Sequence, residues 1–122
     1  MTKEEAIAQF WNSFYIPAYD ESTVPTGAKF PYITFSVKTD SIDNVVMASA
    51  SLWYKSYSWI DIDNMAKAIA RKINQMYPPS IKIDGGRMYI TKGSPFAQRV
   101  ADSDDTIRHI LLNVNFEFLT VD

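Results

Sequence analysis

Apolar and polar residues alternate most regularly near the end of the chain, over residues 109–118. The residues of one parity are Ile110, Leu112, Val114, Phe116 and Phe118, and the other parity holds His109, Asn113, Asn115 and Glu117. A period of two is typical of a β-strand with one buried side. The pattern predicts a long strand that forms the middle of a sheet.

The segment that leads into this strand is polar and is predicted to be a charged loop. It begins near Gly93 and carries three acidic residues between two arginines, namely Asp102, Asp104 and Asp105 between Arg99 and Arg108. Residues 93–120 are therefore expected to hold both the main strand and the main charged loop of the protein.

Two segments have the helical period instead. Thr2 and Glu5 have the spacing of a capping box, and the apolar residues that follow predict a helix over residues 3–14. Ser58 is the predicted N-cap of a second helix, which Pro78 and Pro79 end. The predicted buried stripe of that helix is Met65, Ile69, Ile73 and Met76.

Further alternating runs predict the remaining strands. They cover residues 31–38 and 45–54, and two short runs flank Gly85 and Gly86 in the manner of a hairpin. Residues 17–27 hold two prolines and a glycine and are predicted to be an irregular connection. The fold class expected is α+β, an antiparallel or mixed β-sheet of four to five strands with two helices packed on one face, in one domain over residues 1–122.

Composition narrows the possible functions. The chain has 122 residues, a formal net charge of -2, no cysteine and one histidine. These values exclude disulfides and thiolate zinc sites, and they disfavour a nucleic-acid footprint, which needs a basic surplus. The first residues lack the cationic start of a signal peptide, and no apolar run reaches the length of a membrane span. We expect an intracellular protein without a membrane partner.

Candidate chemistry in the sequence is weak. Ser94, His109 and an aspartate could form a catalytic set, but Ser94 precedes a proline in a predicted loop, and His109 falls on the polar side of a strand. We expect a solvated surface histidine, no enzyme activity and no catalytic, cofactor or metal residues. The acids of residues 102–105 could hold a hard cation, but the spacing of an EF-hand is missing. We expect them to cap a turn, or to pair with arginines of this or a neighbouring chain.

An aromatic cluster is a candidate contact surface. Its members are Trp53, Tyr54, Tyr57 and Trp59. Trp53 and Met47 are expected on the side of their strand that faces away from the core. An apolar patch outside the core commonly marks a protein interface. Packing within the chain is the alternative.

The order of several short motifs resembles that of a known family. The motifs are FPYITF at residues 30–35, SLWY at 51–54, SW at 58–59, KGSPFAQR at 92–99, DD at 104–105, IR at 107–108 and EFLT at 117–120. In this order they resemble the tail terminator, or tail completion, proteins of long-tailed bacteriophages and prophages. The resemblance covers about residues 30–120.

The resemblance implies a structural role in the virion. Members of that family form a ring, typically a hexamer, that caps the head-proximal end of the tail tube, stops its polymerisation and offers a surface for head-tail joining. The implied partners are other copies of this chain, the tail tube protein and the head connector, and the implied location is the virion tail, assembled in the host cytoplasm.

A cyclic ring joins one patch of each subunit to a different patch of the next. The residues expected at such contacts are Met47, Trp53, Arg99, Asp102, Asp104, Asp105 and Arg108. The alternatives are another phage neck or minor tail component, or a small ligand- or metal-binding domain or enzyme that uses the loop of residues 102–105.

Overall fold

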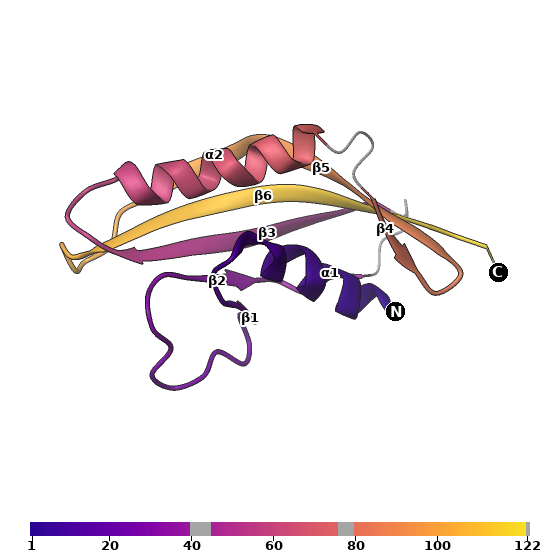
Figure 1. The fold of residues 1–122 in the computed structure, drawn as a ribbon, viewed down its shortest axis with the longest axis horizontal. Helices are drawn as coiled ribbons and strands as arrows, with labels where there is room; N and C mark the ends of the chain where they lie inside the picture. Colours follow the sequence, from indigo (N-terminus) through magenta and orange to yellow (C-terminus); the bar gives the residue numbers. More distant parts are fainter. Residues whose placement is uncertain (40–44, 76–79, 122) are drawn as a thin grey trace.

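A computed structural model of the chain describes residues 1–39, 45–75 and 80–121. Two helices and six strands make up these residues (Figure 1). In chain order they are α1 (Lys3–Trp11), the 3-10 turn η1 (Asn12–Phe14), β1 (Ala18–Asp20), β2 (Tyr32–Phe35), β3 (Val45–Lys55), α2 (Ile60–Gln75), β4 (Ser80–Ile83), β5 (Gly86–Val100) and β6 (Ile107–Thr120). Met76, Pro78 and Pro79 lie outside the described residues.

The strands form a single sheet in the order β1-β2-β3-β6-β5-β4. Among the described strands, the β1–β2 pair is parallel and the other four pairs are antiparallel. The long strand predicted from the alternation is β6, which lies between β3 and β5 as expected for the middle of the sheet. The predicted α+β class with a mixed sheet is confirmed, but the sheet formed by the described residues has six strands rather than four to five.

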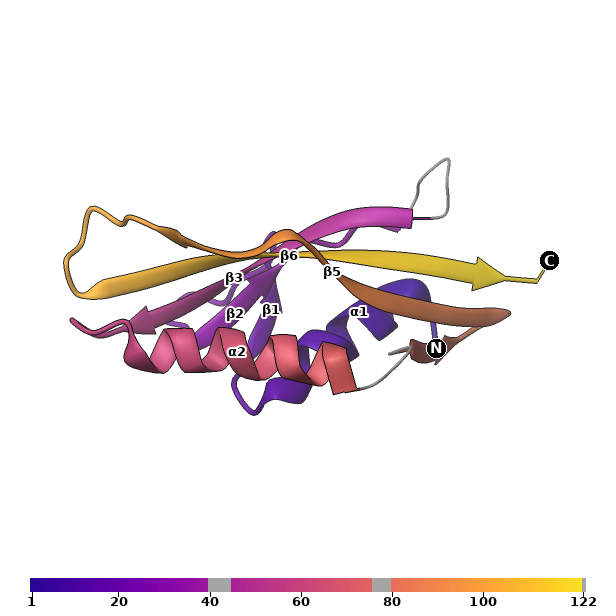
Figure 2. The same cartoon turned by 90° about the horizontal axis from the view of Figure 1, so that it is seen from above.

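Both helices pack on the same face of the sheet (Figure 2). The even-numbered side chains of β6 from Ile110 to Phe118 are buried beneath them, as the alternation predicts. The Phe10 ring of α1 meets the Phe116 ring edge-on at 6.3 Å, and the Lys72 ammonium of α2 donates a hydrogen bond to the Ser13 hydroxyl at 2.7 Å. One core therefore joins the two helices to the sheet.

The helix ends follow the sequence signals. The Thr2 side chain accepts a hydrogen bond from the Glu5 N–H, and the Glu5 side chain accepts one from the Thr2 N–H, so the predicted capping box is present. The Ser58 hydroxyl accepts a hydrogen bond from the Ile60 N–H at the start of α2. The buried stripe of α2 is Ile62, Ala66, Ile69 and Ile73, so it begins one turn earlier than predicted, and Met65 is only partly buried.

The prediction of a long charged loop before β6 is largely wrong. Residues 93–100 belong to β5, and the connection to β6 consists of residues 101–106. The alternation was hidden because β5 has an irregularity: Lys92 is opposite Val114, but Ala97 is opposite Leu112. Between these two pairs, β5 advances by five residues while β6 advances by two. The β5 side chains on the helix side of the sheet are therefore even-numbered before the irregularity and odd-numbered after it.

The sixth strand, β1, lies within the predicted irregular connection. It has three residues, too few to show an alternation, and it pairs with β2 at the edge of the sheet. The Pro17 carbonyl accepts a hydrogen bond from the Ile33 N–H, and the Glu21 N–H donates to the Phe35 carbonyl. Because the odd-numbered residues bond to β2, the N–H and C=O groups of Ala18 and Asp20 point away from β2. The Ala18 N–H donates to the Asn12 side chain, and the Asp20 carbonyl accepts from the Thr23 N–H. Two of the four outward backbone groups of this edge are therefore already bonded within the chain, which disfavours the addition of a further strand.

The β4–β5 turn supports a first prediction. A Cβ atom added at Gly86 would lie 1.8 Å from the Leu119 carbonyl oxygen, while one at Gly27 would meet nothing within 4 Å. We expect Gly86→Ala to lower the free energy of unfolding by at least about 3 kcal/mol, because backbone has to move. Gly27 has a φ of 83°, so Gly27→Ala should cost only about 1 kcal/mol. Urea denaturation compares the two variants, and equal losses would contradict the prediction.

Candidate functional site

The outer face of the sheet, opposite the helices, is the first candidate surface. One end of it carries a row of aromatic side chains that crosses four strands or their ends: Tyr19, Phe30, Tyr32, Trp53 and His109. The Trp53 and His109 rings stack with their centres 3.9 Å apart, and Tyr32 stacks on the other side of Trp53 at 6.4 Å. The Trp53 ring nitrogen donates to the Thr34 hydroxyl. The row is thus fixed in orientation and partly exposed.

His109 is not the solvated residue that the sequence suggested. It faces the outer side as predicted, but its ring is half-buried against Trp53, and its Nε2 atom lies 2.8 Å from the Ser51 hydroxyl. Burial holds the pKa of His109 below its ordinary value of 6.5, while the Asp102 carboxylate acts in the opposite direction. The neutral ring is therefore favoured in the folded protein.

The other end of the outer face is apolar and more open. Met47 is 74% exposed, and Val45 and Leu119 are also exposed there. Asn115 and Glu117 of β6 stand opposite Met47 and Val45. Met47 and Trp53 therefore share one face, at its two ends, and Ser49 and Ser51 lie between them on β3.

The two arginines of the predicted interface point to the helix side instead. Arg99 and Arg108 contact the Trp59 ring at 4.6 and 5.3 Å from its centre. Arg99 also forms an ion pair with Asp63 of α2 at 2.6 Å, and Arg108 donates hydrogen bonds to the carbonyls of Tyr57, Asp105 and Ile107. Trp59 is therefore a fixed contact between α2 and the tip of the β5–β6 hairpin.

The acids of the β5–β6 connection cap a turn, which is one of the two uses expected for them. Asp102 accepts a hydrogen bond from the Asp104 N–H, and Asp104 accepts two from Thr106, through its N–H and its hydroxyl. The Thr106 hydroxyl, and then its N–H, hold the pKa of Asp104 below the ordinary 3.8. The two ion pairs among the described residues are Arg99 with Asp63 and the amino terminus with Asp84, so within this part of the chain these acids pair with no arginine.

The predicted interface residues consequently lie in three places. Met47 and Trp53 are on the outer face, Arg99 and Arg108 are against α2, and the three acids are exposed at the hairpin tip. The parity of β3 in the sequence predicts the outer face. The contact of Trp59 with both arginines leaves no local spacing in the sequence, because the three residues come from separate segments.

The aromatic cluster divides in the same way. Trp53 is on the outer face, Tyr57 is 78% exposed, and Tyr54 is half-buried on the helix side. Burial raises the pKa of the Tyr54 hydroxyl above its ordinary 10.0, and the nearby Asp61 carboxylate adds to the effect. The cluster is therefore part packing within the chain and part exposed surface.

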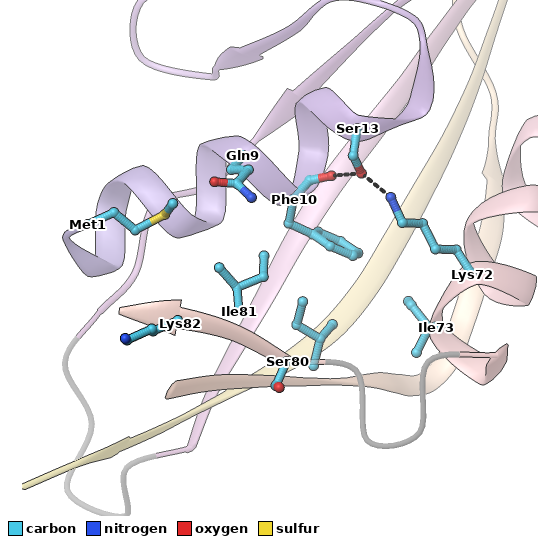
Figure 3. A pocket seen from close by; sticks show the side chains of 10 residues that line it. Met1, Gln9, Phe10, Ser13, Lys72, Ile73, Ser80, Ile81 and Lys82 are labelled. Carbon is cyan, nitrogen blue, oxygen red and sulfur yellow. Dashed lines mark hydrogen bonds between the residues drawn. The ribbon is translucent and has the colours of Figure 1, made fainter. Parts of the chain in front are cut away.

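A cleft of about 370 Å³ lies between α1, the end of α2 and β4 (Figure 3). Its walls are the apolar side chains of Phe10, Ile73, Ile81 and Ile90, and Lys72 reaches across it to Ser13. Ser13 in turn donates to the Phe10 carbonyl at 2.6 Å. The two polar groups are thus occupied in bracing α1 against α2.

The structure does not assemble the catalytic set considered from the sequence. Ser94 lines a hollow beside Asn113, four residues along β6 from His109, which is about 13 Å in a strand. The ring nitrogen of His109 faces Ser51 instead. Among residues 1–39, 45–75 and 80–121, no group of three or more His, Cys, Asp and Glu side chains could hold a metal ion. No helix in that part of the chain is long and apolar enough to span a membrane.

Comparison with known proteins shows a similarity in fold. No protein-family model matches the chain, and no curated protein matches it. Its structure is similar to that of a chain in the virion of a native gene transfer agent particle, with a TM-score of 0.67. The two sequences are 14% identical, and the match covers 93% of this chain and 91% of the other. At this identity the match concerns the fold.

The half-buried imidazole predicts a pH dependence of stability. The pKa of His109 is lower in the folded protein than the value of 6.5 for the unfolded chain. At pH values between these two, His109 binds more protons in the unfolded chain, so the free energy of unfolding decreases as the pH falls. The carboxylates with lowered pKa have ordinary values of 4.5 and 3.8 and stay ionised near pH 6. We expect Tm to decrease from pH 7.5 to 5, and His109→Gln to flatten this dependence. Equal pH profiles for the two proteins would contradict the account.

The hairpin tip gives a matched pair of variants. Asp104→Ala removes two hydrogen bonds to Thr106, whereas the Asp105 side chain makes no hydrogen bond or ion pair among the described residues. We expect Asp104→Ala to lower Tm and Asp105→Ala to leave it unchanged, with no effect of added Ca²⁺ on either. A Ca²⁺-dependent rise in Tm that Asp104→Ala abolishes would instead support a cation site.

Proposed function

We propose that the chain is a structural virion protein of the phage tail, a ring-forming tail terminator without enzymatic activity. The observation that carries the proposal is the likeness in fold, over 93% of the chain, to a chain from a gene transfer agent virion. The ordered motifs of residues 30–120, which resemble those of tail terminators, support the finer assignment.

The surfaces of the molecule suit a protein that works by contact. The outer face combines the open apolar end at Met47 with the fixed aromatic row at Trp53. Apolar and aromatic side chains on an exposed face favour a protein interface. In a ring, this face of one subunit would meet a different surface of the next, and the acids at the hairpin tip would add charged contacts with other virion proteins.

The proposed partners are further copies of the chain in a hexamer, the tail tube protein and the head connector. Within this proposal the ring forms in the cytoplasm of the host and ends in the virion tail, where it stops tube growth and provides the joining surface for the head. Another neck or minor tail component is the nearest alternative, because such proteins use contact surfaces of the same kind.

A metal- or ligand-binding role at residues 102–105 is a weaker candidate. The carboxylates of Asp102 and Asp104 already accept hydrogen bonds within the turn, and a cation would have to compete with these donors. Contact is therefore the better use of this loop.

A substitution on the outer face tests the proposal. Met47 is 74% exposed, so Met47→Glu should leave the fold intact while placing an unpaired carboxylate in the contact. Burying such a charge costs several kcal/mol, so we expect the concentration needed for assembly to rise about 100-fold. Native mass spectrometry and electron microscopy of the protein with tail tubes measure this.

Met47→Leu is the matched control and should assemble like the unaltered protein. If the unaltered protein stays monomeric at high micromolar concentration and also fails to bind tail tubes, the terminator role is wrong. If it assembles and Met47→Glu assembles equally well, the outer face is not the contact.

A further inference from the structure

The two edges of the sheet differ. At one edge, two of the outward backbone groups of β1 are already bonded, the Ala18 N–H to the Asn12 side chain and the Asp20 carbonyl to the Thr23 N–H. At the other edge, β4 pairs among the described residues with residues 86–89 of β5. Within the described part of the chain no strand pairs with that side of residues 97–100, although they are paired with β6 on the other side.

The register shows which backbone groups of this free edge are available. The Ser56 N–H donates to the Thr106 carbonyl, so the even-numbered residues of β6 form their backbone hydrogen bonds with β3. The Ser36 N–H donates to the Ser49 carbonyl, which agrees with this, because the odd-numbered residues of β3 then bond to β2. The odd-numbered residues of β6 consequently form their backbone hydrogen bonds with β5. His109 and Leu111 stand opposite Val100 and Gln98. The N–H and C=O groups of Ala97 and Arg99 consequently point outward, away from β6.

A groove runs beside this edge. It has a volume of about 230 Å³ and lies between the first half of α2 and β5, with Asp63, Ala66 and Lys67 on the helix side. The floor is Ile110 of β6, and Ala97, Gln98 and Arg99 form the strand side. Ala66 and Ala97 are small and leave room between the two walls, while the Arg99–Asp63 ion pair fixes their separation at one point.

We propose that this groove binds an extended acidic segment of another protein, which adds to the sheet as an antiparallel strand next to residues 97–100. An unpaired strand edge is complementary to another extended backbone, because each outward N–H and C=O requires a partner of the opposite kind. A helix alongside the edge gives alternate side chains of the added strand a surface to contact.

The charges of the groove indicate which segment fits. Lys67 takes part in neither ion pair of the described residues, while Asp63 is already paired with Arg99. An acidic side chain opposite Arg99 would lie on the helix side of the sheet, next to Lys67. The position opposite Ala97 faces Ala66 and suits a small apolar side chain.

The same charges disfavour a second copy of this chain as the occupant. Two such grooves in contact would bring Lys67 of both copies together. The edge strand β4 carries Lys82 and no acid, and in β1 the outward Ala18 N–H and Asp20 carbonyl are already bonded. The inference does not depend on ring formation, so it stands or falls separately from the proposed function.

A designed peptide is the probe. In acetyl-Thr-Thr-Glu-Thr-Val-Thr-Thr-amide, antiparallel pairing places the glutamate opposite Arg99 and the valine opposite Ala97. We expect the peptide to shift the amide signals of Ala97 and Arg99 in NMR spectra of the labelled protein and to slow their hydrogen exchange. Absence of these shifts at millimolar peptide, or shifts centred elsewhere, would overturn the proposal. Concentration-dependent shifts of the same amides without peptide would assign the edge to a second copy and also overturn it.

Backbone chemistry separates strand addition from simple side-chain contact. Methylating the amide nitrogens of the peptide glutamate and valine removes the donors that face β5 and should abolish binding, while methylating the central threonine nitrogen, which points away, should not. Ala97→Pro removes an outward N–H without breaking a bond to β6, and should weaken binding about tenfold. Lys67→Glu should weaken the binding of this peptide and strengthen the binding of a peptide that carries lysine in place of the glutamate. Binding that none of these changes affects would overturn strand addition.

Discussion

The pairing of β3 with β6 is the constraint on which the rest of the structure depends. Every residue of β3 has a partner on β6, from Val45 opposite Glu117 to Lys55 opposite Ile107. Because the side chains of a strand alternate, this register decides at once which residues enter the core and which form the outer face. A shift by one residue would expose the buried row of β6 and bury Asn113 and Glu117. The helices, the hairpin and both candidate surfaces take their positions from this pair.

The irregularity in β5 modifies that constraint at one place. Before it, Met88 and Ile90 are buried in the core, whereas after it the exposed residues Ala97 and Arg99 lie on the helix side of the sheet. The second half of β5 therefore presents a small residue and a guanidinium to α2, instead of continuing the apolar row. Arg99 can consequently reach both Asp63 and Trp59. A polar contact thus joins helix to strand at the end of the sheet where the apolar core finishes.

Much of this arrangement could be predicted from the sequence, and the failures have physical causes. Long segments with a single period, such as β6 and both helices, were found because burial imposes the period on the residues themselves. The strand β1 was missed because three residues cannot display a period. The second half of β5 has the sequence pattern of a loop because the irregularity interrupts the alternation. The site was found in part: Met47 and Trp53 follow from parity, whereas the contact of Trp59 with Arg99 and Arg108 depends on tertiary packing that no local pattern records.

The closure of β1 has a consequence for assembly. A sheet that is open at both edges can pass backbone pairing from one molecule to the next without limit, and this is how edge strands lead to fibres. Here the Ala18 N–H is held by Asn12 and the Asp20 carbonyl by Thr23, so a ladder that reaches β1 meets two outward groups that are already bonded. Within the described part of the chain, the edge at residues 97–100 can therefore receive a strand more readily than β1 can pass the series on.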